Sequence, residues 1–254
     1  MFGFLKSIFK STGEVPESAP SAEELRLYSR YNIPTCCPAT FKIKKTEVSG
    51  VISNISYGGL LVDYGSDVKE PSAYSEDPLE VEIEILGEKT TAFVNYVHTY
   101  QNESVLGYCF QHKNVETLVY LREILERFRI GASLRTPPTD MIKPMYRGTG
   151  WTCMRGEGPT DFTYRSKTAS PSEFLLSFRE GEYYNEVRLY QGKLSTATST
   201  DIDGTSSQMN PSKNGLDENI AKKGVEILIG ASNNLDKNEN ISAIIDMIAK
   251  HMRS

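Results

Sequence analysis

Six short strand-like segments with no helix between them are the feature that most constrains this fold. They lie between Pro34 and about His112 and are separated by Gly, Asn, Asp, Ser and Pro. In the clearest, LEVEIEIL at 79–86, apolar residues alternate with three glutamates, as expected of a strand with one face in water. The others are TFKIKKT (40–46), SGVISNIS (49–56), GLLVDYG (59–65), TAFVNYVHTY (91–100) and VLGYCFQH (105–112). Because closure removes exposed edges, this pattern predicts a six-stranded antiparallel β-barrel.

An amphipathic helix is predicted directly after the barrel. The segment VETLVYLREILERFRI (115–130) places Leu118, Leu121, Leu125 and Phe128 on one apolar stripe. We expect this helix to end at Gly131, since glycine is common just past a helix C-terminus.

The chain is long enough for two domains, because 254 residues exceed what one small domain needs. Consecutive prolines in SLRTPPTDMIKP (133–144) disfavour regular structure, so we place the domain boundary there. The predicted parts are an N-terminal segment and linker at 1–23, the barrel domain at 24–131, a linker at 132–144 and a second domain at 145–254.

The second domain is predicted to be α+β, a strand meander followed by two helices. The predicted strands are DFTYRSKT (161–168), EFLLSFRE (173–180), YYNEVRLYQG (183–192) and KLSTATSTD (193–201), and TSSQMNPSKNG (205–215) is predicted to be a loop. The predicted helices are DENIAKKGVEILIGA (217–231) and ISAIIDMIAKHM (241–252). The second helix has four isoleucines on one face, which fits either a core contact or dimerisation.

The first ten residues, MFGFLKSIFK, predict a short amphipathic helix with Lys6 and Lys10 as an i, i+4 pair. Two lysines attract anionic lipid only weakly, so any membrane contact would be peripheral and reversible. A partner protein, a frayed terminus or docking on the chain itself are the alternatives. The following STGEVPESAPSA (11–22) has the composition of a flexible linker.

Composition and charge exclude several classes of protein. A net charge of -5 argues against DNA or RNA binding, which needs a basic surface, and no apolar run approaches the roughly 20 residues of a membrane helix. Neither CxxC nor Cys/His metal spacing is present, and no secretory signal is readable, so we expect a cytoplasmic protein with no metal and no cofactor. The four cysteines are Cys36, Cys37, Cys109 and Cys153, and the three histidines are His98, His112 and His251. The adjacent pair Cys36 and Cys37 is interpreted as small buried hydrophobic residues, with a redox pair as the alternative.

Two short motifs stand in front of and inside the predicted barrel. RLYSR carries Arg26 and Arg30 in an RxxxR pattern, and NISYGG (54–59) gives NxSxxG at the turn between two predicted strands. In this order and placement they resemble the PilZ domain family over about residues 24–131. The resemblance implies a barrel that binds cyclic di-GMP in bacteria, with Arg26 and Arg30 on a loop before it.

The same resemblance implies roles for the second motif. Asn54 and Ser56 are expected to hydrogen-bond a guanine or its phosphate, Gly59 to let the backbone come close, and Gly58 to assist the turn. Many family members have aspartate where this chain has Asn54; the amide lacks charge-assisted acceptance from guanine N–H groups but repels the dianion less. Leu25 stands where some members carry another arginine that stacks on a second nucleotide. We therefore expect one cyclic di-GMP per domain.

The chemistry of arginine suits this ligand. Cyclic di-GMP is a dianion with two guanines, and a guanidinium can donate bidentately to phosphate or to the guanine O6/N7 edge and can stack on a base. The predicted function is a cyclic di-GMP effector without enzyme activity, in which the ligand orders the arm onto the barrel and changes domain or partner contacts. The output partner is expected to bind the second domain or the N-terminal segment. The sequence does not choose among motility, surface attachment, polysaccharide secretion and transcription.

Alternative interpretations start from the same residues. The arginines can be a solvated helical face, and Asn54 and Gly59 ordinary turn residues, which gives a non-binding barrel that serves as a protein-interaction module. An enzyme with its site in the second domain is the less favoured alternative. The groups available to it are Cys153, Asp161, Asp201 and Asp203, none with a His partner at recognisable spacing.

Overall fold

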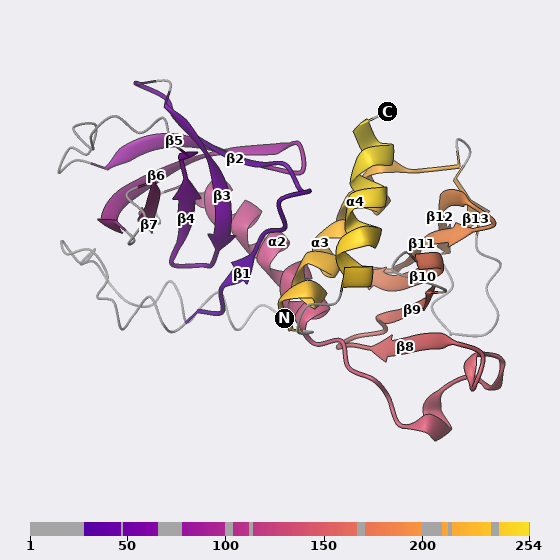
Figure 1. The fold of residues 1–254 in the computed structure, drawn as a ribbon. Coiled ribbons are helices and arrows are strands. Elements are labelled where there is room, and N and C mark those ends of the chain that lie inside the picture. The colour runs from indigo at the N-terminus through magenta and orange to yellow at the C-terminus, as the bar shows by residue number, and fades with distance from the viewer. Residues whose placement is uncertain are drawn as a thin grey trace.

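The described residues of this computed structural model form two antiparallel sheets and three α-helices (Figure 1). The structure describes residues 28–46, 48–65, 78–99, 104–111, 114–166, 171–199, 210–212, 215–234 and 239–253. The predicted N-terminal helix, its linker and Arg26 lie outside these residues. The buried apolar side chains of both sheets and the helices form one continuous cluster.

The first sheet closes into the predicted six-stranded antiparallel barrel. Its strands are β2 (Ala39–Ile43), β3 (Ser49–Ile55), β4 (Gly59–Asp63), β5 (Leu79–Ile85), β6 (Glu88–Thr99) and β7 (Val105–Gln111). They pair in the order β2-β5-β6-β7-β4, and β3 joins β4 to β2. A further two-residue strand that was not predicted, β1 (Tyr31–Asn32), pairs with the C-terminal end of β3.

Strand β5 follows the alternation that its sequence predicts. Its apolar residues Leu79, Val81, Ile83 and Ile85 are buried, whereas the glutamates between them are only partly so. Inside the barrel the Phe41 ring stacks on the Tyr108 ring at 4.9 Å between centroids. Burial of these side chains is the main force that closes the barrel.

Helix α2 (Val115–Ala132) follows the barrel, as predicted, but its end differs from the prediction. The Asn114 side chain caps its start by accepting a hydrogen bond from the Glu116 N–H at 2.9 Å. Leu121, Leu125 and Phe128 are buried, and Leu118 is only half-buried. The predicted stop at Gly131 is wrong, because the helix continues through this residue to Ala132.

The reason lies in how α2 meets α3 (Glu218–Asn234). A Cβ on Gly131 would lie 1.7 Å from the Ile227 carbonyl oxygen, and a Cβ on Gly230 would lie 1.9 Å from the Phe128 carbonyl oxygen. Each helix thus contributes a glycine where it crosses the other. Gly131 permits close helix packing and does not cap a helix.

The second sheet is the predicted meander with two additional strands. In the order β13-β12-β11-β10-β9-β8, its strands are β8 (Trp151–Arg155), β9 (Asp161–Ser166), β10 (Pro171–Glu180), β11 (Tyr183–Tyr190), β12 (Lys193–Ser199) and β13 (Asn210–Pro211). Strand β8 was not predicted, and β13 falls in the stretch predicted to be a loop. Both predicted helices are present, as α3 and α4 (Glu239–Arg253), between the barrel and this sheet (Figure 1).

The segment after α2 attaches to the second sheet at once. Leu134 is fully buried, and Arg135 exchanges two backbone hydrogen bonds with Arg155 of β8, at 3.0 and 2.8 Å. Two short 3₁₀ turns follow, η4 (Thr139–Met141) and η5 (Pro144–Tyr146). The first residues of the predicted linker 132–144 are therefore packed against the second domain.

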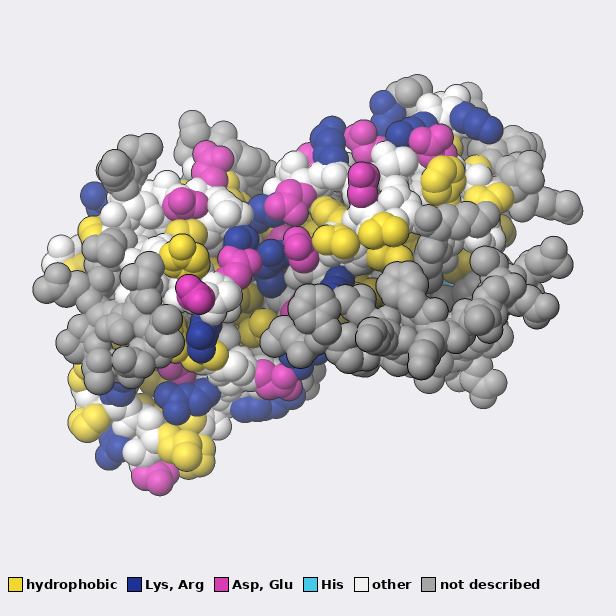
Figure 2. Space-filling model, turned by 180° about the vertical axis from the view of Figure 1, so that it is seen from behind, with side chains coloured by type: hydrophobic (Ala, Val, Ile, Leu, Met, Phe, Trp, Pro, Cys, Tyr) yellow, Lys and Arg dark blue, Asp and Glu magenta, His cyan; other side chains and the backbone are white. Residues whose placement is uncertain are grey.

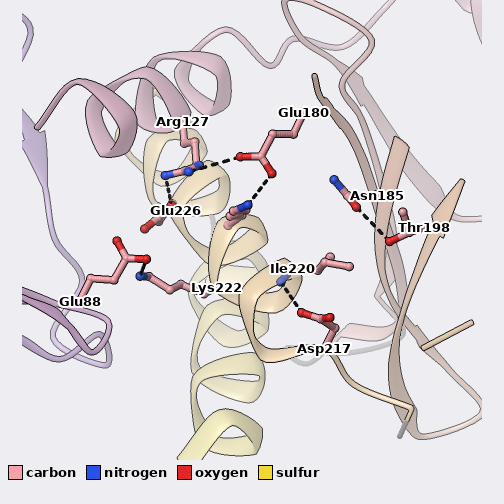
Figure 3. Close-up of polar contacts among 10 residues, drawn as sticks. Glu88, Arg127, Glu180, Asn185, Thr198, Asp217, Ile220, Lys222 and Glu226 are labelled. Atoms are coloured by element: carbon pink, nitrogen blue, oxygen red, sulfur yellow. Dashed lines mark hydrogen bonds and ion pairs between the residues drawn. The ribbon is translucent and has the colours of Figure 1, made fainter. Parts of the chain in front are cut away.

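A buried carboxylate lies where the barrel, the helices and the second sheet meet (Figure 3). The Glu226 side chain on α3 is fully buried and forms an ion pair with Arg127 of α2 at 3.0 Å. Its burial raises its pKa to about 7, an effect that the nearby Arg127 and Lys222 cations partly oppose. The cluster is costly to bury unless its charges stay paired.

Two further ion pairs extend this cluster to both sheets. Lys222 of α3 pairs with Glu88 at the start of β6, and Lys223 pairs with Glu180 at the end of β10 (Figure 3). In the view from behind, basic and acidic side chains lie side by side over the middle of the molecule (Figure 2). Charge pairing thus accompanies apolar burial where the two sheets approach the helices.

Candidate functional site

A small surface pocket contains most of the motif residues that the structure describes. It lies where β1, β3, β4, β6 and β7 come together. Its lining residues are Arg30, Asn54, Ser56, Gly59, Leu60, Leu61, Val97, His98, Gly107 and Tyr108. The structure therefore brings Arg30, Asn54, Ser56 and Gly59 together, while Gly58 is not part of the lining.

Strand register explains why this pocket exists. Asn54 pairs with Leu61, Leu61 with Gly107, and Gly107 with His98, so these four residues form one row across four strands. Register partners share a face of the sheet, and the adjacent residues Leu60 and Leu106 are buried in the core. The row therefore lies on the outside of the barrel.

Gly107 makes room in the middle of this row. A Cβ there would lie 2.8 Å from Cε1 of His98, so the imidazole ring occupies the space that a side chain would take. The sequence reasoning missed both Gly107 and His98. Neither belongs to a motif, and only the pairing of β6 with β7 brings them opposite Asn54.

Asn54 is available to a ligand in this arrangement. It is half-buried on β3, next to a register shift that falls between Ile52 and Asn54. Such bulges re-aim a side chain relative to a regular strand. The Asn54 side chain forms no hydrogen bond with any residue that the structure describes, so its amide can both donate and accept.

Ser56 and Gly59 hold the turn between β3 and β4. The Ser56 N–H donates to the Gly59 carbonyl oxygen at 2.8 Å, and the buried Ser56 Oγ donates to the same oxygen at 3.2 Å. The hydroxyl proton is therefore used within the turn. What Ser56 can offer a ligand here is a pair of oxygen lone pairs, which suit a guanine N–H donor.

The two glycines of the motif serve the backbone of the barrel. A Cβ on Gly59 would lie 2.1 Å from the Tyr108 carbonyl oxygen, so glycine is needed for β4 to pair with β7. The Gly58 carbonyl oxygen accepts a hydrogen bond from the Phe110 N–H at 3.0 Å. The close approach expected of Gly59 is thus made, in this structure, to a neighbouring strand.

Arg30 is exposed at the mouth of the pocket, directly before β1. It forms no ion pair with any described residue, and the described residues that line the pocket include no aspartate or glutamate. A guanidinium with no carboxylate near it among the described residues attracts an anion. Arg26, the other arginine of the motif, lies outside the residues that the structure describes.

The two motifs also touch through a pair of tyrosines that the sequence reasoning missed. The rings of Tyr28, from RLYSR, and Tyr57, from NISYGG, are 5.9 Å apart between centroids. Burial raises the pKa of Tyr57, and the nearby Arg122 cation of α2 lowers it. The signal available in the sequence was one aromatic residue inside each motif.

The groups available to an enzyme lie elsewhere. Cys153 and Asp161 line a cavity of about 120 Å³ on the second sheet, with no histidine among its described lining residues. Asp161 pairs with Arg155 at 2.8 Å, and burial raises the pKa of the Cys153 thiol, which disfavours the reactive thiolate. Asp201 and Asp203 lie outside the described residues.

The cysteines give no sign of redox pairing. None of Cys36, Cys37, Cys109 and Cys153 forms a disulfide within the described part of the chain, and of these four Cys36 is the most exposed. Among the residues that the structure describes, no group of three or more His, Cys, Asp or Glu side chains is arranged to hold a metal ion.

Comparison with known proteins leaves the site to be argued from its own geometry. No protein-family model matches the chain, and no curated protein matches it. Within the described part of the chain, none of the helices has the length and apolar character needed to cross a bilayer.

Proposed function

We propose that this protein is a cyclic di-GMP-binding effector of bacterial second-messenger signalling that works in the cytoplasm and is not an enzyme. The observation that carries the proposal is that Arg30 and Asn54, which belong to two separate motifs, line one pocket on the barrel surface. That arrangement supports the resemblance to the PilZ family, because its two motifs must act on one ligand. Arg26 is proposed to act with Arg30.

The chemistry of the pocket matches each part of the ligand. The exposed Arg30 guanidinium donates to phosphate oxygens or to the guanine O6/N7 edge. The Asn54 amide, which has no hydrogen-bond partner among the described residues, and the lone pairs of Ser56 complement guanine donors and acceptors. A dianion meets no carboxylate among the described residues that line the pocket. Tyr28 and Tyr57 add aromatic faces next to the turn, on which a base can stack.

Isothermal titration of the full chain with cyclic di-GMP tests the proposal. We expect binding of one equivalent, because Leu25 cannot donate to a second nucleotide. Arg30→Ala should weaken the affinity roughly 10- to 150-fold, since losing one charge-assisted contact costs about 1.5–3 kcal/mol.

Arg179→Ala is the matched control, because Arg179 is also exposed but lies on β10 of the second sheet. It should bind like the wild type, and GMP should bind far more weakly than the dinucleotide. Absence of heat with cyclic di-GMP, or equal affinity of the Arg30→Ala variant, contradicts the assignment.

A non-binding barrel that acts as a protein-interaction module is the second candidate. The observation in its favour is that Ser56 and Gly59 stabilise the β3–β4 turn and the pairing of β4 with β7, which explains their presence without a ligand. In that case the titration with cyclic di-GMP gives no heat, and the barrel itself makes the contact with a partner protein.

A further inference from the structure

The side chain of Asn233 reaches from the last turn of α3 to the backbone of β1. Its Oδ1 accepts a hydrogen bond from the Asn32 N–H at 2.6 Å, and its Nδ2 donates to the Asn32 carbonyl oxygen at 2.8 Å. Nδ2 also donates to the Ile229 carbonyl oxygen at 2.8 Å, which anchors the amide to its own helix. In this orientation of the amide, Oδ1 faces a backbone donor and Nδ2 faces two backbone acceptors. A flipped amide would satisfy none of these three groups.

This contact takes the place of a neighbouring strand. Strand β1 pairs with β3 on one side, where the Ile33 N–H donates to the Ser53 carbonyl oxygen at 2.9 Å. Backbone groups alternate between the two edges of a strand, so those of Asn32 point away from β3. The Asn233 amide satisfies both of them, although these two residues lie 201 positions apart in the chain.

Strand β1 also sits beside the proposed ligand site. Asn32 is the register partner of Asn54, and Arg30 is the second residue before it. The buried Tyr31 between them packs its ring against the Phe128 ring of α2, at 5.5 Å between centroids. Arg30 is therefore the first residue outside a segment fixed by β3, α2 and α3 together.

Helix α3 packs on α2 of the barrel domain and also contacts the second sheet. It is tied to α2 by the glycine crossing and to β10 by the Lys223–Glu180 ion pair, and it also packs on β11. A displacement of β1 therefore acts on α3, which is packed against the second sheet. The hydrogen bonds of Asn233 link the β1 backbone directly to α3.

We propose that Asn233 is a positioning residue for the cyclic dinucleotide site, which holds β1 so that Arg30 stays at the pocket and which couples ligand binding to α3. The inference rests on the proposed function. Coupling between two sites is reciprocal. If the hydrogen bonds between Asn233 and Asn32 favour ligand binding, the bound ligand in turn stabilises those hydrogen bonds. Ligand binding at the barrel thereby affects the second domain through α3, without any contact between the ligand and that domain.

Titration of the full-length Asn233→Ala variant with cyclic di-GMP tests this coupling. We expect three- to thirtyfold weaker binding, because β1 loses two hydrogen bonds and Arg30 is no longer held in place. Asn233→Asp keeps an acceptor for the Asn32 N–H but loses the donor to the Asn32 carbonyl oxygen. Its affinity for cyclic di-GMP should therefore lie between those of the wild type and Asn233→Ala. Ser232→Ala is the control, since the Ser232 hydroxyl bonds only within α3, to the Ile229 carbonyl oxygen at 2.8 Å.

Hydrogen exchange distinguishes this coupling from a purely structural role of Asn233, which would not make the exchange rates of β1 and α3 depend on the ligand. In the wild type, cyclic di-GMP should slow exchange of the Asn32 amide and of the last turn of α3. In Asn233→Ala it should slow exchange near Asn54 only.

The outcomes separate this inference from the proposed function. If the wild type binds, Arg30→Ala weakens binding and Asn233→Ala binds within twofold of wild type, or more tightly, the positioning role is overturned and the function stands. If the wild type does not bind cyclic di-GMP at all, both are overturned.

Discussion

Gly59 stands at the start of β4 with its α-carbon against the backbone of β7. Because the blocking atom at 2.1 Å is a carbonyl oxygen of a paired strand, no side-chain rotation can relieve the clash. The same residue would be required in a barrel that binds nothing. A glycine in a binding motif therefore needs a stability measurement before a ligand role is assigned to it.

Gly59→Ala should lower the free energy of unfolding by at least about 3 kcal/mol, since either β4 or β7 must move. Gly148→Ala is the comparison: its φ of +67° is left-handed, but a Cβ there meets nothing within 4 Å. That variant should lose only about 1 kcal/mol, from backbone strain alone. Urea denaturation of both checks this, and equal losses would contradict the packing explanation.

Residue types were predictable in this site, but neighbours were not. The resemblance of RLYSR and NISYGG to the PilZ motifs singles out Arg30, Asn54, Ser56 and Gly59 as expected site residues. His98 and Gly107 enter the pocket only because β6 and β7 pair in one particular register. If one of these strands slipped by one residue, its own residue would turn to the other face and His98 would no longer lie opposite Gly107.

At the scale of elements, alternation and apolar stripes predicted most strands and all the helices that the structure describes. Strand β8 was missed because WTCMR is short, has no clear alternation and follows a glycine-rich stretch. Its extended form depends on pairing with β9 on one side and on the Arg135 contact on the other. Tertiary pairing supplied what local propensity did not.

The end of α2 also depends on tertiary packing, because Gly131 lies where this helix crosses α3. Replacing Gly131 by alanine would favour an isolated helix by about 1 kcal/mol. Here the new Cβ would lie 1.7 Å from the Ile227 carbonyl oxygen, so the helices must separate. We expect Gly131→Ala to destabilise the protein by at least about 2 kcal/mol, opposite in sign to the propensity effect.

Gly224→Ala is the matched control for this prediction. A Cβ on Gly224 meets the Val187 Cγ2 atom at 2.8 Å, which is a longer approach than at Gly131 and involves a side-chain atom and not the backbone. Its loss should be clearly smaller, measured as the shift of the thermal midpoint. A Gly131→Ala variant as stable as wild type would mean that the close crossing is not needed.

At the scale of the whole molecule, Glu226 makes stability depend on pH. Its pKa of about 7 in the folded state lies above the ordinary value of 4.5, because burial disfavours its charge. The folded state therefore holds a proton that the unfolded state releases between these two values. The contribution of this group to stability is fully present below about pH 4.5 and is lost as pH rises through about 7.

Glu226→Gln removes this titration and keeps the side-chain volume. The variant should gain stability relative to the wild type as pH rises from 5 to 8, by up to about 3 kcal/mol. Glu180→Gln is the control, since that carboxylate contacts Arg127 and Lys223 but is 43% exposed. Urea midpoints at several pH values check this, and parallel profiles for wild type and Glu226→Gln would refute it.

The sequence by itself determined the barrel, the meander and the helices, because each depends on local periodicity, and it pointed to the motif residues through their resemblance to the PilZ motifs. The tertiary structure alone decided that Arg30 meets Asn54, that α2 crosses α3 at two glycines and that Asn233 holds β1. These contacts join residues far apart in the chain, and their partners have no shared pattern. Register, close backbone approach and hydrogen-bond geometry set them, and all three exist only once the chain has folded.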